Sequence, residues 1–144
     1  SNITLLNYAV SDSDGQITYY KGQDSCTNNI IGHDMNFAKC QEAGVITSVS
    51  LDTLLKDVGP IKMIKIDVEG AELSVLRGMG SIIKNVQYIV VECHLDEDWD
   101  AIRDMLLVDY ELAAVNIITG EKVDAQSKRP YQCFCKQRFT NDQI

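Results

Sequence analysis

The sequence lacks long apolar runs, an excess of basic residues, and any internal repeat or low-complexity tract. No apolar run approaches the roughly 20 residues that a membrane helix needs, and no basic start followed by an apolar stretch marks a signal peptide. The formal net charge of −8 argues against a nucleic-acid backbone or an anionic membrane as the main partner. At 144 residues the chain has the length of one domain with a real core. We therefore expect a single cytoplasmic globular domain.

The cysteines do not form a recognisable metal pattern. There are five of them without a secretory signal, which favours reduced thiols. Cys133 and Cys135 alternate along an expected strand, so both would face one side of it. No second pair of cysteines or histidines at matching spacing accompanies them, so two buried core thiols are favoured over zinc.

Apolar strand patterns alternate with helical patterns through most of the chain. Strands are expected at 3–11, 16–20, 45–50, 62–66, 88–92, 110–116 and 131–136, and helices at 51–57, 71–79 and 96–107. Residues 21–44 are polar and predict a long irregular loop, with a short helix near 36–40. The order predicts an α/β fold with a mostly parallel sheet, covered by helices on both faces, and an antiparallel pair at its C-terminal edge.

The most informative segment joins the expected buried central strand at 62–66 to the helix that follows. Asp67, Glu69 and Glu72 stand at this joint, and ligands of open α/β sheets bind beyond the carboxyl ends of strands. Asp67 therefore lies either in an active site or at the cap of the next helix. Glu69 faces the same crevice or stabilises the helix dipole, whereas Glu72 is expected to be structural, bonding back to an amide.

The joint and its flanks resemble the FkbM family of S-adenosylmethionine-dependent methyltransferases. The match rests on the segment IKIDVEGAE at 64–72 followed by VLRG at 75–78, with weaker support from 7–12, 49–55 and 90–92. The resemblance implies part of a class I methyltransferase sheet, which is Rossmann-like. It also implies S-adenosylmethionine as cofactor and methyl transfer to a hydroxyl of a sugar or another small molecule.

One part of the family pattern is missing from the sequence. The family begins with a glycine-rich turn that admits the cofactor, and no Gly-x-Gly pattern follows a strand here. Gly78 and Gly80 close a helix instead. Residues 1–144 are therefore expected to be one methyltransferase-like domain without the N-terminal cofactor-binding half. Either a missing N-terminal segment or a second chain would then complete the sheet, or the N-terminal strand packs elsewhere.

The candidate site residues lie at strand ends. Asp67, Glu92 and His94 are the candidate bases, and Asp67 and Glu92 are expected to be neighbours that raise one another's pKa. By the resemblance, Asp12, Asp67 and Glu69 line the cofactor site; Asp12 would reach the adenine, unless it only bonds its own turn.

Three alternatives remain beside these assignments. Acids at this edge can also hold a divalent metal through oxygen, and His94 is either a base, a metal ligand or a loop histidine, but no metal is assigned. A catalytically inactive remnant that acts as an interaction module is the rival function. A metal-dependent hydrolase is less favoured, because too few acids or histidines stand at strand ends.

Overall fold

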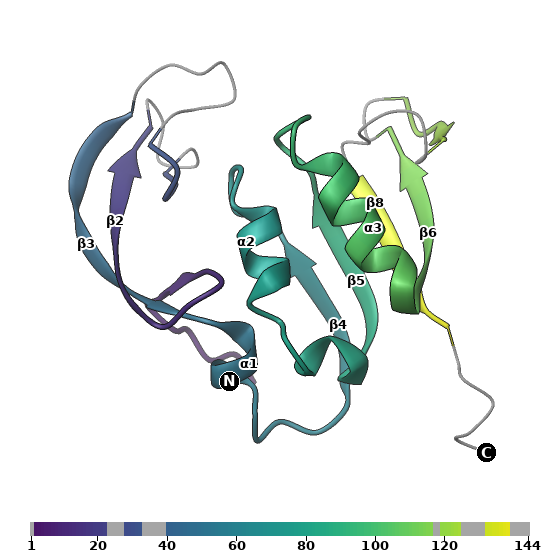
Figure 1. Cartoon of the computed structure of the whole chain (residues 1–144), viewed down its shortest axis with the longest axis horizontal. Helices are drawn as coiled ribbons and strands as arrows, with labels where there is room; N and C mark the ends of the chain where they lie inside the picture. The colour runs from purple at the N-terminus through teal and green to yellow at the C-terminus, as the bar shows by residue number, and fades with distance from the viewer. Residues whose placement is uncertain (1, 23–27, 33–39, 117–118, 125–131, 139–144) are drawn as a thin grey trace.

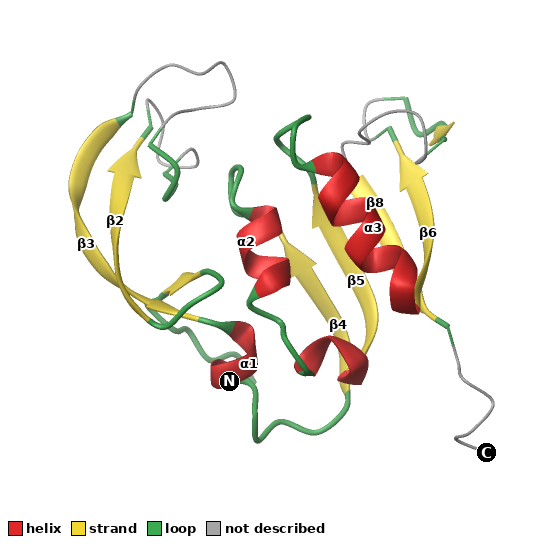
Figure 2. Cartoon of the chain, in the orientation of Figure 1, coloured by secondary structure: helices red, strands yellow, loops and turns green. Residues whose placement is uncertain are grey.

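The chain forms two sheets with short helices between and beside them (Figures 1 and 2). The computed structural model describes residues 2–22, 28–32, 40–116, 119–124 and 132–138. The first sheet has the order β1 (Ala9–Val10), β3 (Gln41–Val49), β2 (Gly15–Lys21). The second has the order β4 (Ile61–Ile66), β5 (Val86–Glu92), β8 (Gln132–Gln137), β6 (Tyr110–Val115), β7 (Lys122–Val123). The helices are α1 (Leu51–Leu54), α2 (Glu72–Arg77), the 3-10 helix η2 (Ile82–Asn85) and α3 (Trp99–Asp109).

The N-terminal strand is much shorter than the sequence predicts. Only Ala9 and Val10 pair, in parallel with the end of β3, and Leu5 upstream is 91% exposed. A strand needs a partner for its backbone groups, and β3 offers one only beside these two residues.

The strand predicted at 16–20 is confirmed as β2. β3 starts earlier than predicted, so the polar loop that was predicted to reach position 44 ends at position 40. The helix predicted near 36–40 falls largely outside the described residues.

The strand predicted to be central and buried lies at an edge of its sheet. β4 is extended as expected, but among the described strands it pairs only with β5, and only Ile66 at its end is buried. The β4–β5 pair is parallel, and the other pairs of this sheet are antiparallel. The sheet is therefore mixed rather than mostly parallel. The predicted antiparallel pair of the last strands is confirmed as β6–β8, with the two-residue β7 outside it.

Helices on both faces were also predicted, and the structure corrects this. Residues of α2, η2 and α3 form one buried cluster with the side chains that β5 and β8 turn to the same side, such as Ile89, Val91 and Cys133. Figure 2 shows these helices in front of the five-stranded sheet. The alternate residues Met63 and Phe134 are exposed. In the described part of the chain, the opposite face is thus an open face that carries apolar side chains.

Close backbone packing fixes the end of β1 against α2. Ser11 O would lie 2.1 Å from a Cβ added at Gly78, so no other residue fits there without a shift. The amide of Asp12 donates to Ser74 Oγ, and the amide of Asp52 donates to Gly78 O. Ser50 caps α1, because its Oγ accepts from the amide of Thr53. None of the described helices has the length and apolarity needed to cross a membrane.

Candidate functional site

A tight left-handed turn connects β4 to α2. Glu69 has φ 53° and Gly70 has φ 99°, a conformation that only glycine adopts without strain. The amide of Gly70 donates to Glu72 Oε1 at 3.0 Å. The turn therefore directs Glu69 outward at the carboxyl end of β4, while Glu72 at the start of α2 turns inward.

A buried ionic pair forms behind this turn. His94, two residues beyond β5, brings Nδ1 to within 2.7 Å of Glu72 Oε1. Their side chains are 8% and 1% exposed. The same carboxylate oxygen also accepts from the amide of Gly70. Glu72, at the start of α2, therefore connects the turn after β4 to the loop after β5. Its own bond to an amide was expected, and its bond to His94 was not.

The pKa values of this group follow from burial and contact. The hydrogen bond to Glu72 raises the pKa of His94 above its ordinary value and outweighs the opposing effect of burial. Burial works to raise the pKa of Glu72, but hydrogen bonds from His94 and Gly70 outweigh it and leave that pKa lowered. Burial raises the pKa of Glu69, and the nearby His94 only partly offsets this. The pair thus favours an imidazolium facing a carboxylate.

An exposed ionic group lies beside the buried pair. Lys65 Nζ donates to Asp67 Oδ2 and lies 3.6 Å from Glu92 Oε2. Gln132 Nε2 donates to the same oxygen of Glu92 at 3.2 Å. The contact with Asp67 raises the pKa of Lys65. Asp67 and Glu92 are therefore neighbours at the ends of β4 and β5, as expected. The ammonium of Lys65 lies near both carboxylates, whereas the sequence had suggested two acids that repel each other directly.

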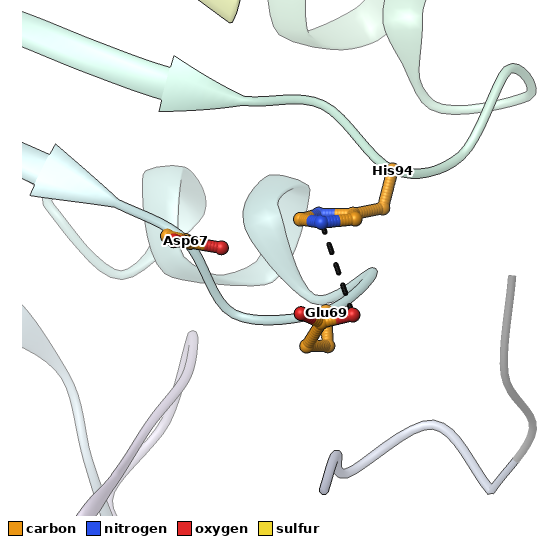
Figure 3. A group of neighbouring side chains, drawn as sticks. All are labelled: Asp67, Glu69 and His94. Atoms are coloured by element: carbon orange, nitrogen blue, oxygen red, sulfur yellow. Dashed lines mark ion pairs between the residues drawn. The ribbon is translucent and has the colours of Figure 1, made fainter. Parts of the chain in front are cut away.

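Three side chains converge at this edge, as Figure 3 shows. Asp67, Glu69 and His94 each place one possible ligand atom within 4.8 Å of the others. The imidazole reaches from the β5 loop toward both acids, and His94 Nε2 lies 3.8 Å from Glu69 Oε2. Asp67 and Glu69 also line a hollow of about 430 Å³, whose other wall comes from residues 8–10 and 28–30. The two predicted acids are thus in reach of solvent and of a small ligand.

Two predicted features do not join this cluster. Asp12 follows β1, but its amide is bonded to Ser74 of α2, and it does not line the hollow. Cys133 and Cys135 point to the buried side of β8 with their sulfurs 3.7 Å apart. The contact with Cys133, together with burial, raises the pKa of Cys135 far above its ordinary range. Two protonated core thiols fit that position, as the sequence favoured.

Glu72 is the functional-site residue whose role sequence reasoning missed. Its position in the first turn of α2 is fully explained by helix capping, so nothing local pointed to a partner at position 94. The signal that could have found it is a histidine placed just beyond the neighbouring strand, since parallel strands end at one edge.

Comparisons with known proteins agree with the resemblance seen in the sequence. A family model described as the methyltransferase FkbM domain matches residues 1–116. The hexuronic acid methyltransferase AglP of Haloferax volcanii is 30% identical over 95 residues, which are 65% of this chain and 37% of that protein. The matched region therefore spans little more than a third of that relative. No solved structure matches.

Proposed function

Because this chain belongs to the methyltransferase FkbM domain family, we propose that it acts in methyl transfer from S-adenosylmethionine to a small-molecule hydroxyl. One observation carries the proposal. The family segment at 64–72 places Asp67 and Glu69 at the end of a parallel strand, on the wall of a hollow of about 430 Å³ and beside His94. Such strand ends are where ligands of α/β sheets bind.

The residues of this edge suit the task of positioning a hydroxyl and taking its proton. Asp67 and Glu69 offer acceptor oxygens that can orient an incoming O–H group. Glu72 holds His94 in one orientation. At a pH above the raised pKa of His94 its imidazole is neutral, and a neutral imidazole is the commonest proton acceptor in enzymes. Lys65 balances the charges of Asp67 and Glu92, which favours an orienting role for these two acids.

The described residues fit S-adenosylmethionine in part. When bound, the cofactor supplies the methyl group from a sulfonium cation, and the carboxylates of Asp67 and Glu69 attract a cation to this hollow. The glycine-rich turn expected for the methionine portion does not occur in the sequence. We therefore propose that a further segment or a second chain supplies that wall and adds strands beside the edge strand β4.

A carbohydrate is the favoured acceptor class. The matched relative is named for a hexuronic acid, and a sugar offers several hydroxyls to an edge rich in acceptor oxygens. We propose a sugar hydroxyl as the acceptor within the broader class of small-molecule hydroxyls.

A calorimetric titration of the chain with S-adenosylmethionine and with its demethylated product tests the proposal. We expect saturable binding at one site per chain, or binding once a segment bearing a glycine-rich turn is added. Asp67→Asn should weaken it, whereas Asp57→Asn, an exposed turn residue, should not. No binding in either case, with the fold intact by circular dichroism, would contradict the proposal.

The open face of the sheet favours a second candidate function, that of an inactive interaction module. Met63, Tyr88 and Phe134 line an apolar hollow of about 420 Å³ on that face, and exposed apolar patches mark contact surfaces. This alternative predicts a folded chain that never binds the cofactor. The same titration therefore separates the two functions.

A further inference from the structure

We propose that Asp67, Glu69 and His94 bind a divalent transition-metal ion such as Mn²⁺ at the edge of the five-stranded sheet. Sequence reasoning assigned no metal to this chain. The structure brings two carboxylate oxygens and one imidazole nitrogen within 4.8 Å of one another from two separate loops (Figure 3). Ligand atoms at about 2.0–2.2 Å from one ion lie at most about 4.4 Å apart, so the three side chains need to close in by only a few tenths of an ångström to bind it.

The environment of His94 is an independent observation that points to a ligand. Its side chain is more than nine-tenths buried, and Glu72 engages Nδ1 from behind. In the described residues the imidazole makes no other hydrogen bond, and Nε2 is directed at the cluster, 3.8 Å from Glu69. Metal-ligating histidines almost always donate their other ring N–H to a carboxylate, which fixes the tautomer and the ring orientation.

The chemistry of the three ligands selects the kind of ion. Carboxylate oxygens suit Mg²⁺, Ca²⁺ and Mn²⁺, whereas imidazole suits transition metals. A mixed set of two oxygens and one nitrogen therefore favours Mn²⁺ or Zn²⁺ over Mg²⁺. Lys65 holds one oxygen of Asp67, and a carboxylate has a second oxygen with which to bind an ion.

The backbone supports an outward-facing Glu69. Its left-handed φ of 53° is strained for a residue with a side chain, and its side chain is only 25% exposed. A cation would satisfy this carboxylate where the turn holds it. The two oxygen ligands also line the hollow, so the open positions of the ion would face a small ligand.

The chain can bind the ion whether or not it transfers methyl groups, but a catalytic role for the ion rests on the proposed function. In that role the ion would hold the acceptor hydroxyl and lower its pKa, because a cation stabilises the deprotonated oxygen. The proton could then leave to solvent without His94 as the base.

The test is a titration of the full 144-residue chain, freed of metal with a chelator, with Mn²⁺ followed by the electron paramagnetic resonance signal of the free ion. We expect saturation at one ion per chain, displacement by Zn²⁺, and clearly weaker binding of Mg²⁺. Glu69→Gln and His94→Gln should each weaken binding at least about tenfold, and Glu72→Gln by about 10–100-fold, since the residue behind a ligand also matters. Glu97→Gln, a change at an exposed acid on the approach to α3, is the matched control and should leave binding unchanged.

Two further measurements keep the result decisive. Glu69 is partly exposed, so Glu69→Gln remains a valid test if His94→Gln fails to fold. Mn²⁺ should broaden the amide resonances of residues 67–69 and 94 first. Undiminished binding to Glu69→Gln, broadening elsewhere, Mg²⁺ binding as tight as Mn²⁺, or no saturable binding would each overturn the proposal. If the chain binds Mn²⁺ but never the cofactor, the metal site stands and the proposed function fails. If the chain binds the cofactor but not Mn²⁺, the proposed function stands and the metal site fails.

Discussion

Two ionic groups occupy the same edge of the five-stranded sheet, and they differ in burial. His94 and Glu72 lie on the helix-covered side, with side chains 8% and 1% exposed. Lys65 and Asp67 lie beside them, with side chains 49% and 39% exposed. The buried pair is held by backbone and side-chain contacts, whereas water screens the exposed pair. The comparison teaches that the buried pair of His94 and Glu72 fixes the positions of the side chains at this edge. The exposed pair of Lys65 and Asp67 is accessible to a ligand.

The largest expected effect comes from breaking the buried pair. Glu72→Ala leaves His94 buried beside Glu69 alone and removes the acceptor for the amide of Gly70. We expect a loss of about 3–5 kcal/mol of unfolding free energy, because an uncompensated buried charge remains. Urea denaturation measures it, with Glu97→Ala as an exposed control that should stay within about 0.5 kcal/mol. A loss as small as the control's would mean that the pair does not organise the edge.

The turn between the two groups should give the next largest effect. Gly70→Ala places a Cβ at φ 99° and 2.6 Å from the end of the Ile31 side chain. Ile31 can move, but the backbone strain stays, so we expect a loss of more than about 1 kcal/mol. Gly59→Ala is the matched control, because nothing lies within 4 Å of its added Cβ. Thermal unfolding of both variants checks this, and equal stability of the two would refute it.

The pH dependence of stability separates the groups further. Because the pKa of His94 is raised in the folded chain, its stabilisation is fully present below the unfolded pKa of about 6.5. It is lost as the pH rises through the higher folded pKa. We expect the melting temperature of the wild type to fall over that window, and His94→Gln to show a flatter profile. Parallel profiles of the two proteins would contradict this assignment.

The smallest effect is expected at the exposed group. Lys65→Met removes the ammonium shared by Asp67 and Glu92, and exposed ion pairs contribute about 0–1 kcal/mol. We expect a change in that range that shrinks in high salt, measured by urea denaturation against Lys56→Met, an exposed lysine near α1. A loss comparable to that of Glu72→Ala would erase the difference between the groups.

Local patterns in the sequence predicted the central elements well. The apolar run before Asp67 forms β4, the alternating pattern at 16–20 forms β2, and the segment at 64–72 identifies the family. The predicted length of the N-terminal strand was wrong. Residues 3–8 would need a neighbouring strand to pair with, and β3 pairs only with Ala9 and Val10. The sequence also did not predict that β4 lies at the edge of its sheet, because a run of apolar residues looks the same in a central strand and in an edge strand.

The sequence by itself determined the order of strand, acidic turn and helix at the candidate site, because these depend on side-chain periodicity and on a left-handed glycine at position 70. Only the tertiary structure decided that Glu72 orients His94, that Lys65 joins Asp67 to Glu92, and that none of the described helices covers one face of the five-stranded sheet. These features join residues up to 27 positions apart (65 to 92) or depend on which elements cover a strand. Such contacts arise when β4 and β5 pair in parallel and bring their ends together, which no local pattern encodes.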